Sequence, residues 1–157
     1  MIQTMSQLLA SAQAPQILSA LETALKNTNE SPFWEKRIVP LSSAILSVLI
    51  PLRDQKLLFN PEGEPQETLN AELFLRWCDL LSLKTLAFIL QQSNDASKLV
   101  RTKYSDEKAQ HYQVLDLSEL GTYLSAQTVN LEDEYLDFPI ANYNLHIGIA
   151  DIIKKLL

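Results

Sequence analysis

The chain has 157 residues, of which 46% are hydrophobic and 20% charged, a composition typical of a globular protein and too apolar for intrinsic disorder. Nineteen acidic against thirteen basic residues give a net charge of −6, so the surface as a whole is a poor match for duplex DNA. Three glycines are too few for a turn-rich β-sandwich or a glycine-rich phosphate loop, which disfavours a self-contained nucleotide enzyme.

Cysteine usage and hydropathy indicate a protein of the reducing cytoplasm. The one cysteine, Cys78, has no partner for an internal disulfide and follows Trp77 in an apolar run, which predicts a buried, inert thiol. No segment reaches the roughly 18 consecutive apolar residues that a membrane span requires, and the N-terminus lacks the features of a signal peptide. We therefore expect a cytoplasmic chain that does not insert into a membrane.

The N-terminal part of the sequence predicts two short helices. Leucine and isoleucine recur three and four residues apart over residues 5–26, the spacing of one helix face. Pro15 lacks a backbone donor and would clash with the preceding turn, so it divides the stretch into two helices that meet near Gln13.

A third helix follows and is expected to be the central one. Ser31 is a favourable N-cap, and Pro32 suits the first helical position because its missing N–H would be unpaired there anyway. Apolar residues over 33–52 form a stripe broad enough for burial on several sides. Pro40 and Pro51 should bend this helix or end it locally.

The rest of the chain continues the helical pattern. In order, we expect a loop at 60–67, helices at 68–81 and 83–92, a polar stretch at 98–113, a helix from 118 as far as 129, and a last helix at 141–157. Ser82 is the expected cap of the helix at 83–92. The brief apolar alternation at 114–117 is too short to indicate a strand. The prediction is a single all-α domain over residues 1–157, a compact bundle of about six to eight helices.

No residue pattern predicts catalytic, cofactor or metal chemistry. The sequence lacks both the P-loop pattern and the dinucleotide-binding glycine pattern. His111 and His146 have no second ligand at metal spacing; we expect His146 to be packed at a helix interface and His111 to be exposed. Cys78 and the serines lack the neighbours of an activated nucleophile. The expectation is therefore a protein without catalytic residues, cofactor or metal.

Two polar segments are candidates for binding a partner. A basic and aromatic cluster suits contact with single-stranded DNA or a protein partner through phosphate contacts and stacking, although a solvated loop of mixed charge explains it too. This cluster consists of Lys98, Arg101, Lys103, Tyr104, Lys108 and Tyr112. An acidic cluster suits docking of a basic partner, with a solvated loop as the alternative. This second cluster consists of Glu132, Asp133, Glu134 and Asp137.

Three motifs in the predicted central helix carry a resemblance to a known family. They are an aromatic-Trp-x-x-Arg element (Phe33, Trp34, Arg37), a small and leucine-rich stretch at 41–46, and a Leu-Arg-Asp element that contains Arg53 and Asp54. In order and spacing they resemble the segment after the Walker A half in type IV secretion coupling proteins, the TraD/TraG-like and DotL-like conjugation ATPases. The family's alanine after the first arginine is isoleucine here, and the Walker A and Walker B motifs are absent.

The resemblance implies that the chain is the all-α domain of a larger coupling ATPase. Such proteins form a ring, here expected to be hexameric, at the cytoplasmic face of the bacterial inner membrane. The all-α domain caps that ring and docks cargo: a relaxase or relaxosome accessory protein, single-stranded DNA, or effector proteins. On this interpretation the domain binds and does not catalyse. We expect Phe33 and Trp34 in the core, and Arg37 with the Arg53–Asp54 pair in a polar network at the helix ends.

Two other functional classes remain open from the residues alone. A free-standing helical adaptor or regulatory domain would bind a partner in a groove between amphipathic helices. A small α-helical enzyme that uses a buried carboxylate would need a polar, concave pocket.

Overall fold

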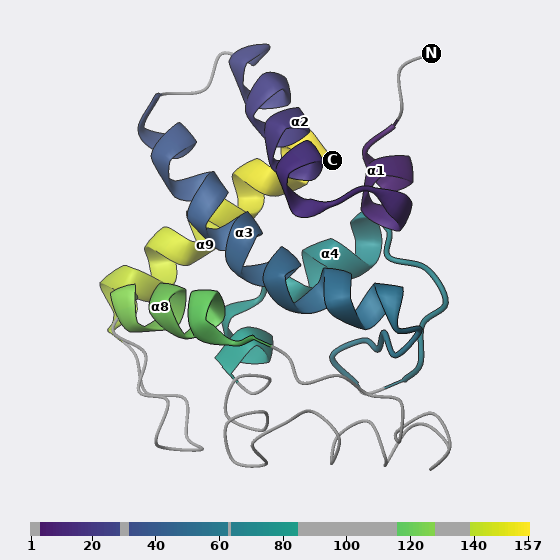
Figure 1. Ribbon diagram of the computed structural model, residues 1–157. Helices are drawn as coiled ribbons and strands as arrows, with labels where there is room; N and C mark the ends of the chain where they lie inside the picture. The colour runs from purple at the N-terminus through teal and green to yellow at the C-terminus, as the bar shows by residue number, and fades with distance from the viewer. Residues whose placement is uncertain (1–3, 29–31, 63, 85–115, 128–138) are drawn as a thin grey trace.

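The computed structural model describes residues 4–28, 32–62, 64–84, 116–127 and 139–157 (Figure 1). The bounded helices are α1 Met5–Ser11, α2 Ala14–Lys26, α3 Pro32–Asp54, α4 Ala71–Trp77, α8 Ser118–Ala126 and α9 Ile140–Leu156. Residues 80–84 are helical as well. Over the described residues there is no strand, only an isolated bridge between Phe59 and Pro65. The all-α prediction is confirmed, with seven helices packed together in the described parts of the chain.

The division of the N-terminal stretch at Pro15 is confirmed. Thr4 caps α1: its Oγ1 accepts from the Gln7 backbone N–H at 3.2 Å, and its own N–H donates to Gln7 Oε1 at 2.8 Å. A similar contact opens α2, where the Gln13 N–H donates to Gln16 Oε1 at 3.0 Å. Pro15 lies in the first turn of α2, where its missing N–H costs no helical hydrogen bond.

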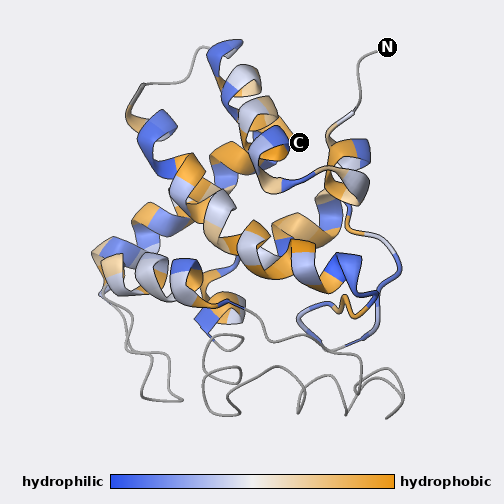
Figure 2. Cartoon of the chain, viewed as in Figure 1, coloured by the Kyte–Doolittle hydropathy of each residue, from blue (hydrophilic) through white to orange (hydrophobic). Residues whose placement is uncertain are grey.

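Helix α3 is the centre of the described fold. It packs against α2, α8 and α9, and the apolar residues from Ile38 to Leu52 are almost all buried. Pro40 and Pro51 lie inside the helix, which bends and does not end (Figure 1). Figure 2 shows apolar and hydrophilic residues alternating along the helices, as expected when one face of each is buried. Among the described helices, none combines the length and apolar character needed to cross a bilayer.

The start of α3 differs from the expectation of a fully buried aromatic pair. Phe33 is 45% exposed, and Trp34 is half-buried and packed against the core. Both residues lie in the first two turns of α3, before the helix enters the bundle at Ile38. The expectation that Phe33 lies in the core is therefore wrong, because this turn of α3 projects beyond the neighbouring helices.

The connection after α3 is a loop that contributes to the core. Lys56 has a φ of 61°, and this left-handed residue lets the Leu57 N–H reach back to the Leu52 carbonyl at 2.8 Å, which closes the end of α3. Leu58 and Phe59 are buried, and the Trp77 indole N–H donates to the Phe59 carbonyl at 3.1 Å. This segment, which precedes the predicted loop at 60–67, thus packs against α4.

The next two helices have N-terminal caps that differ from those predicted from the sequence. Helix α4 begins at Ala71 and not at residue 68, because the Asn70 side chain accepts the Leu73 N–H at 2.9 Å. The helical residues 80–84 are capped by Asp79, whose Oδ2 accepts from both the backbone N–H and the hydroxyl of Ser82 at 3.1 Å. The prediction that Ser82 is the cap is therefore wrong, since Ser82 donates to the cap from inside the helix.

Candidate docking groove

An open cavity of about 740 Å³ lies between α3, α8 and α9, and we call it the α3–α8–α9 groove. It exceeds the pocket of about 400 Å³ between α4 and α9. Its lining is mostly apolar and includes three charged residues, Lys36 and Arg37 on α3, which together we call the basic edge, and Glu119 on α8. The lining residues are Lys36, Arg37, Val39, Pro40 and Ser43 on α3, Ser118, Glu119, Thr122, Tyr123, Ala126 and Gln127 on or just after α8, and Leu145 and Ile149 on α9.

The groove's α3 and α8 walls are held together by a hydrogen bond. The Ser43 hydroxyl donates to Glu119 Oε2 at 2.6 Å, which links residues 76 positions apart in the chain. Glu119 also lies in the first turn of α8, where a negative charge is favourable. On the α3 wall, Pro40 has no N–H, so the Lys36 carbonyl lacks its usual i+4 donor. The walls are therefore joined, and one backbone acceptor beside the groove lacks its helical donor.

A stacked set of side chains holds Arg37 at the basic edge of the groove. The Arg37 Cζ lies 3.4 Å from the Phe33 ring centroid, and its Nη1 donates to the Phe33 carbonyl at 2.8 Å. Phe33 in turn meets Trp34 edge to face, with ring centroids 5.0 Å apart. Trp34 lies against Gly148 of α9, where an added Cβ would be 2.8 Å from the indole Cη2. Because Gly148 has no side chain, it leaves room for the Trp34 ring, which packs against Phe33.

The floor of the groove is tied to α4 through a buried histidine. The His146 Nε2–H donates to the Cys78 carbonyl, which can only accept, so Nδ1 is the acceptor for the Tyr123 hydroxyl at 2.7 Å. Burial lowers the pKa of His146, opposed by the bond to Cys78 and the charge of Asp79, and burial raises the pKa of Tyr123. The neutral imidazole therefore connects α8, α9 and the end of α4. This confirms the prediction that His146 is packed at a helix interface.

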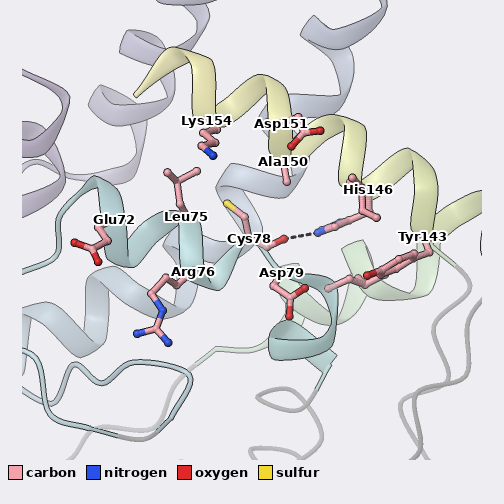
Figure 3. A pocket seen from close by; sticks show the side chains of 12 residues that line it. Glu72, Leu75, Arg76, Cys78, Asp79, Tyr143, His146, Ala150, Asp151 and Lys154 are labelled. Atoms are coloured by element: carbon pink, nitrogen blue, oxygen red, sulfur yellow. Dashed lines mark hydrogen bonds between the residues drawn. The ribbon is translucent and has the colours of Figure 1, made fainter.

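The second pocket, between α4 and α9, has a charged lining (Figure 3). Figure 3 shows that the His146 ring, which lines this pocket, is directed at the Cys78 carbonyl. Cys78 is buried, as predicted, and burial raises the pKa of its thiol to about 12. Arg76 is paired with Glu62 outside the pocket. The groups left around it, Glu72, Asp79, Asp151 and Lys154, do not converge on one point that would mark a ligand of definite charge.

The second arginine of the family-like motifs has a different position. Arg53 Nη1 donates to the carbonyls of Leu9 and Ala12, both at 2.8 Å, at the C-terminal end of α1. Its Nε and Nη2 both lie 3.0 Å from Asp54 Oδ1, and the arginine side chain is 7% exposed. The Arg53–Asp54 pair thus joins the end of α3 to the junction of α1 and α2, away from the groove.

The sequence-predicted binding clusters lie outside the described residues. This holds for the basic and aromatic cluster of Lys98, Arg101, Lys103, Tyr104, Lys108 and Tyr112, for the acidic cluster of Glu132, Asp133, Glu134 and Asp137, and for His111. Within the part of the chain that the structure describes, no group of three or more His, Cys, Asp or Glu is arranged to hold a metal ion.

The groove itself was missed by sequence reasoning. The apolar stripe over 33–52 predicts that residues such as Val39 are buried, and the sequence does not indicate which helix faces meet. The one local signal is Pro40, a proline inside an apolar helix that follows two basic residues, Lys36 and Arg37, by four and three positions.

Comparisons with known proteins give no relative on which to base a function. No protein-family model matches the sequence, and neither the curated proteins nor the solved structures contain a significant match.

Proposed function

We propose that this chain is a cargo-docking domain of a type IV coupling ATPase, which binds an amphipathic helix of a relaxase or relaxosome accessory protein in the α3–α8–α9 groove. The domain binds this cargo and leaves catalysis to the ATPase modules of its parent protein. The parent assembles as a hexameric ring at the cytoplasmic face of the bacterial inner membrane. This proposal follows the resemblance of the Phe33 to Asp54 motifs, and the geometry of the groove supports its binding role.

The observation that carries the binding role is the apolar groove itself. Its exposed or half-buried apolar residues include Val39, Pro40, Ala126 and Leu145, which lie on three different helices. Its volume of about 740 Å³ is in the range of sites that bury several side chains of a ligand. A groove between helices takes an amphipathic helix well, since anchors spaced three and four residues apart fill it from one face.

The groove is also prepared for binding before a partner arrives. The Ser43–Glu119 hydrogen bond fixes α3 against α8, and the Tyr123–His146 hydrogen bond fixes α8 against α9. Walls that are already ordered lower the entropic cost of association. We therefore expect docking without a large rearrangement of these three helices.

The test is binding of purified relaxase, and separately of its accessory protein, from the mobile element that encodes this chain. Isothermal titration calorimetry should detect binding of one of the two to the wild-type chain. Ala126→Glu places a charge in the groove and should weaken binding by at least about tenfold. Ser125→Glu is the matched control, because Ser125 is the exposed neighbour on α8 that does not line the groove.

Three outcomes decide the proposal. Binding that Ala126→Glu weakens and Ser125→Glu leaves unchanged supports docking in the groove. Binding that both variants retain places the cargo on another surface and contradicts the groove. Absence of binding to either purified protein contradicts the relaxosome as cargo.

A further inference from the structure

We infer that the helix docked in the α3–α8–α9 groove carries a carboxylate where it passes Arg37. This inference rests on the proposed docking function and adds the chemistry of the partner. It follows from how Arg37 is held, from the charges around the groove, and from the apolar character of the walls between them.

Arg37 is ordered by its own helix and keeps donors for a ligand. Stacking on Phe33 fixes the plane of the guanidinium, and the bond to the Phe33 carbonyl occupies Nη1. Among the described residues the ion pairs are Arg53–Asp54 and Arg76–Glu62, so Arg37 has no carboxylate partner there. The Nε and Nη2 donors of a guanidinium match the two oxygens of a carboxylate, and a group ordered in advance loses less entropy on binding.

The neighbours of Arg37 favour a single negative charge. Lys36 is exposed and also lines the groove, so the α3 edge is basic. On the α8 wall, Glu119 is directed to Ser43 and carries the opposite charge. A partner with one carboxylate on the α3 side satisfies the basic edge and avoids Glu119.

Nucleic acid fits this arrangement less well than an acidic helix. A phosphate backbone places a charge at every nucleotide, so a strand that reached Arg37 would also bring phosphates to the wall that holds Glu119. The apolar surface of Val39, Pro40 and Leu145 makes few favourable contacts with such a strand. It packs well against leucine or isoleucine side chains of a helix. The groove therefore favours an amphipathic helix with an acidic flank.

The experiment selects ligands from a phage-displayed library of single helices randomised along one face. Binders are collected on the wild-type chain, and those that also bind Ala126→Glu are discarded. We expect groove-dependent helices with Asp or Glu at one flanking position. One selected helix is then synthesised with Glu, Gln or Lys at that position, and its affinity is measured by fluorescence anisotropy.

The Glu peptide should bind wild type about fivefold more tightly than the Gln peptide at low salt, and the Lys peptide should bind more weakly than either. Arg37→Gln should remove this preference. Arg76→Gln is the matched control, since it deletes a guanidinium that does not line the groove. Phe33→Leu keeps the Arg37 charge without the ring and should reduce the preference in part.

The outcomes separate this inference from the docking function. If the selected helices bind in the groove without a preference for Asp or Glu, the inferred carboxylate is wrong but the docking function stands. The same holds if the preference for Glu persists in Arg37→Gln. No groove-dependent helix at all overturns both. Oligothymidine that binds wild type and is lost in Ala126→Glu would assign the groove to nucleic acid and also overturn the inference.

Discussion

Arg37 and Arg53 lie on the same helix and both donate to backbone carbonyls, yet they have different surroundings. Arg53 reaches the carbonyls of Leu9 and Ala12 on another helix, and its side chain is 7% exposed. Within the part of the chain that the structure describes, Arg37 donates to the carbonyl of Phe33 in its own helix and to no other helix, and it lines the groove. A guanidinium that joins two helices stabilises the fold, whereas one held within its own helix keeps donors for a ligand. The first prediction tests this difference directly.

Replacement of Arg53 should give the largest loss of stability. Arg53→Met keeps most of the side-chain length but removes both hydrogen bonds to the end of α1 and the partner of Asp54. Hydrogen bonds from a charged donor to partly buried acceptors are individually strong, so we expect the free energy of unfolding to fall by about 3 kcal/mol. Urea denaturation followed by circular dichroism measures this loss.

Arg37→Met is the matched variant for that measurement. Because the hydrogen bond of Arg37 among the described residues lies within its own helix, its replacement should cost less than about 1 kcal/mol. Equal losses for the two variants would contradict the distinction between a structural and an available arginine.

Gly148→Ala tests the arrangement that holds Arg37. The new methyl group would lie 2.8 Å from the Trp34 indole, so the ring or α9 must move. Overpacking of this kind exceeds the gain from alanine's helix propensity, and we expect a net loss of about 1 to 2 kcal/mol. Gly121→Ala on α8 is the control, because a Cβ added there would have no described atom within 4 Å apart from its chain neighbours and its own helix backbone. That variant should be stabilised by up to about 1 kcal/mol. Thermal unfolding that ranks the two variants in the opposite order would refute the packing argument.

Much of the fold could be predicted because its signals are local. The apolar spacing gave the helices, and Pro15 gave the break between α1 and α2. Local signals failed where two nearby residues compete for one role. Asp79 and Ser82 are both good caps three positions apart, and the sequence alone could not decide which one accepts.

The candidate groove could not be predicted because it depends on long-range packing. Ser43 and Glu119 are 76 positions apart in the chain, and the residue spacing in neither segment predicts the hydrogen bond between them. The exposure of Phe33 has the same origin, since it depends on where α3 enters the bundle and not on the residue type. Residue patterns predict which face of a helix is apolar, but not which neighbour leaves part of that face open.

His146, which holds the groove residue Tyr123, should make stability depend on pH. Burial keeps the pKa of His146 below its value in the unfolded chain, so the unfolded state binds the proton more readily. The stabilising effect is fully present above about pH 6.5 and is lost as the pH falls below it, by at most about 1.4 kcal/mol per pH unit. Urea denaturation at a series of pH values between about 7.5 and 5.5 gives the slope.

His146→Leu serves as the control for that slope. The variant loses its bonds to Tyr123 and Cys78 and will be less stable at every pH, so the informative quantity is the pH dependence and not the stability itself. The slope between about pH 6.5 and 5.5 should become flatter than in the wild type. A slope that is unchanged would show that other groups cause it.

The smallest effect is expected at the closed end of α3, next to Arg53. Lys56 has a φ of 61°, a conformation that costs a residue with a Cβ but not glycine. Lys56→Gly should therefore raise the free energy of unfolding by about 0.5 kcal/mol. This gain is smaller than the strain energy that is relieved, because glycine has more conformational freedom in the unfolded chain. Lys56→Ala removes the same exposed charge without relieving the strain and should bring no gain. If both variants gained equally in thermal unfolding, the cause would be loss of the charge, and the left-handed turn would not be a source of strain at this end of the helix.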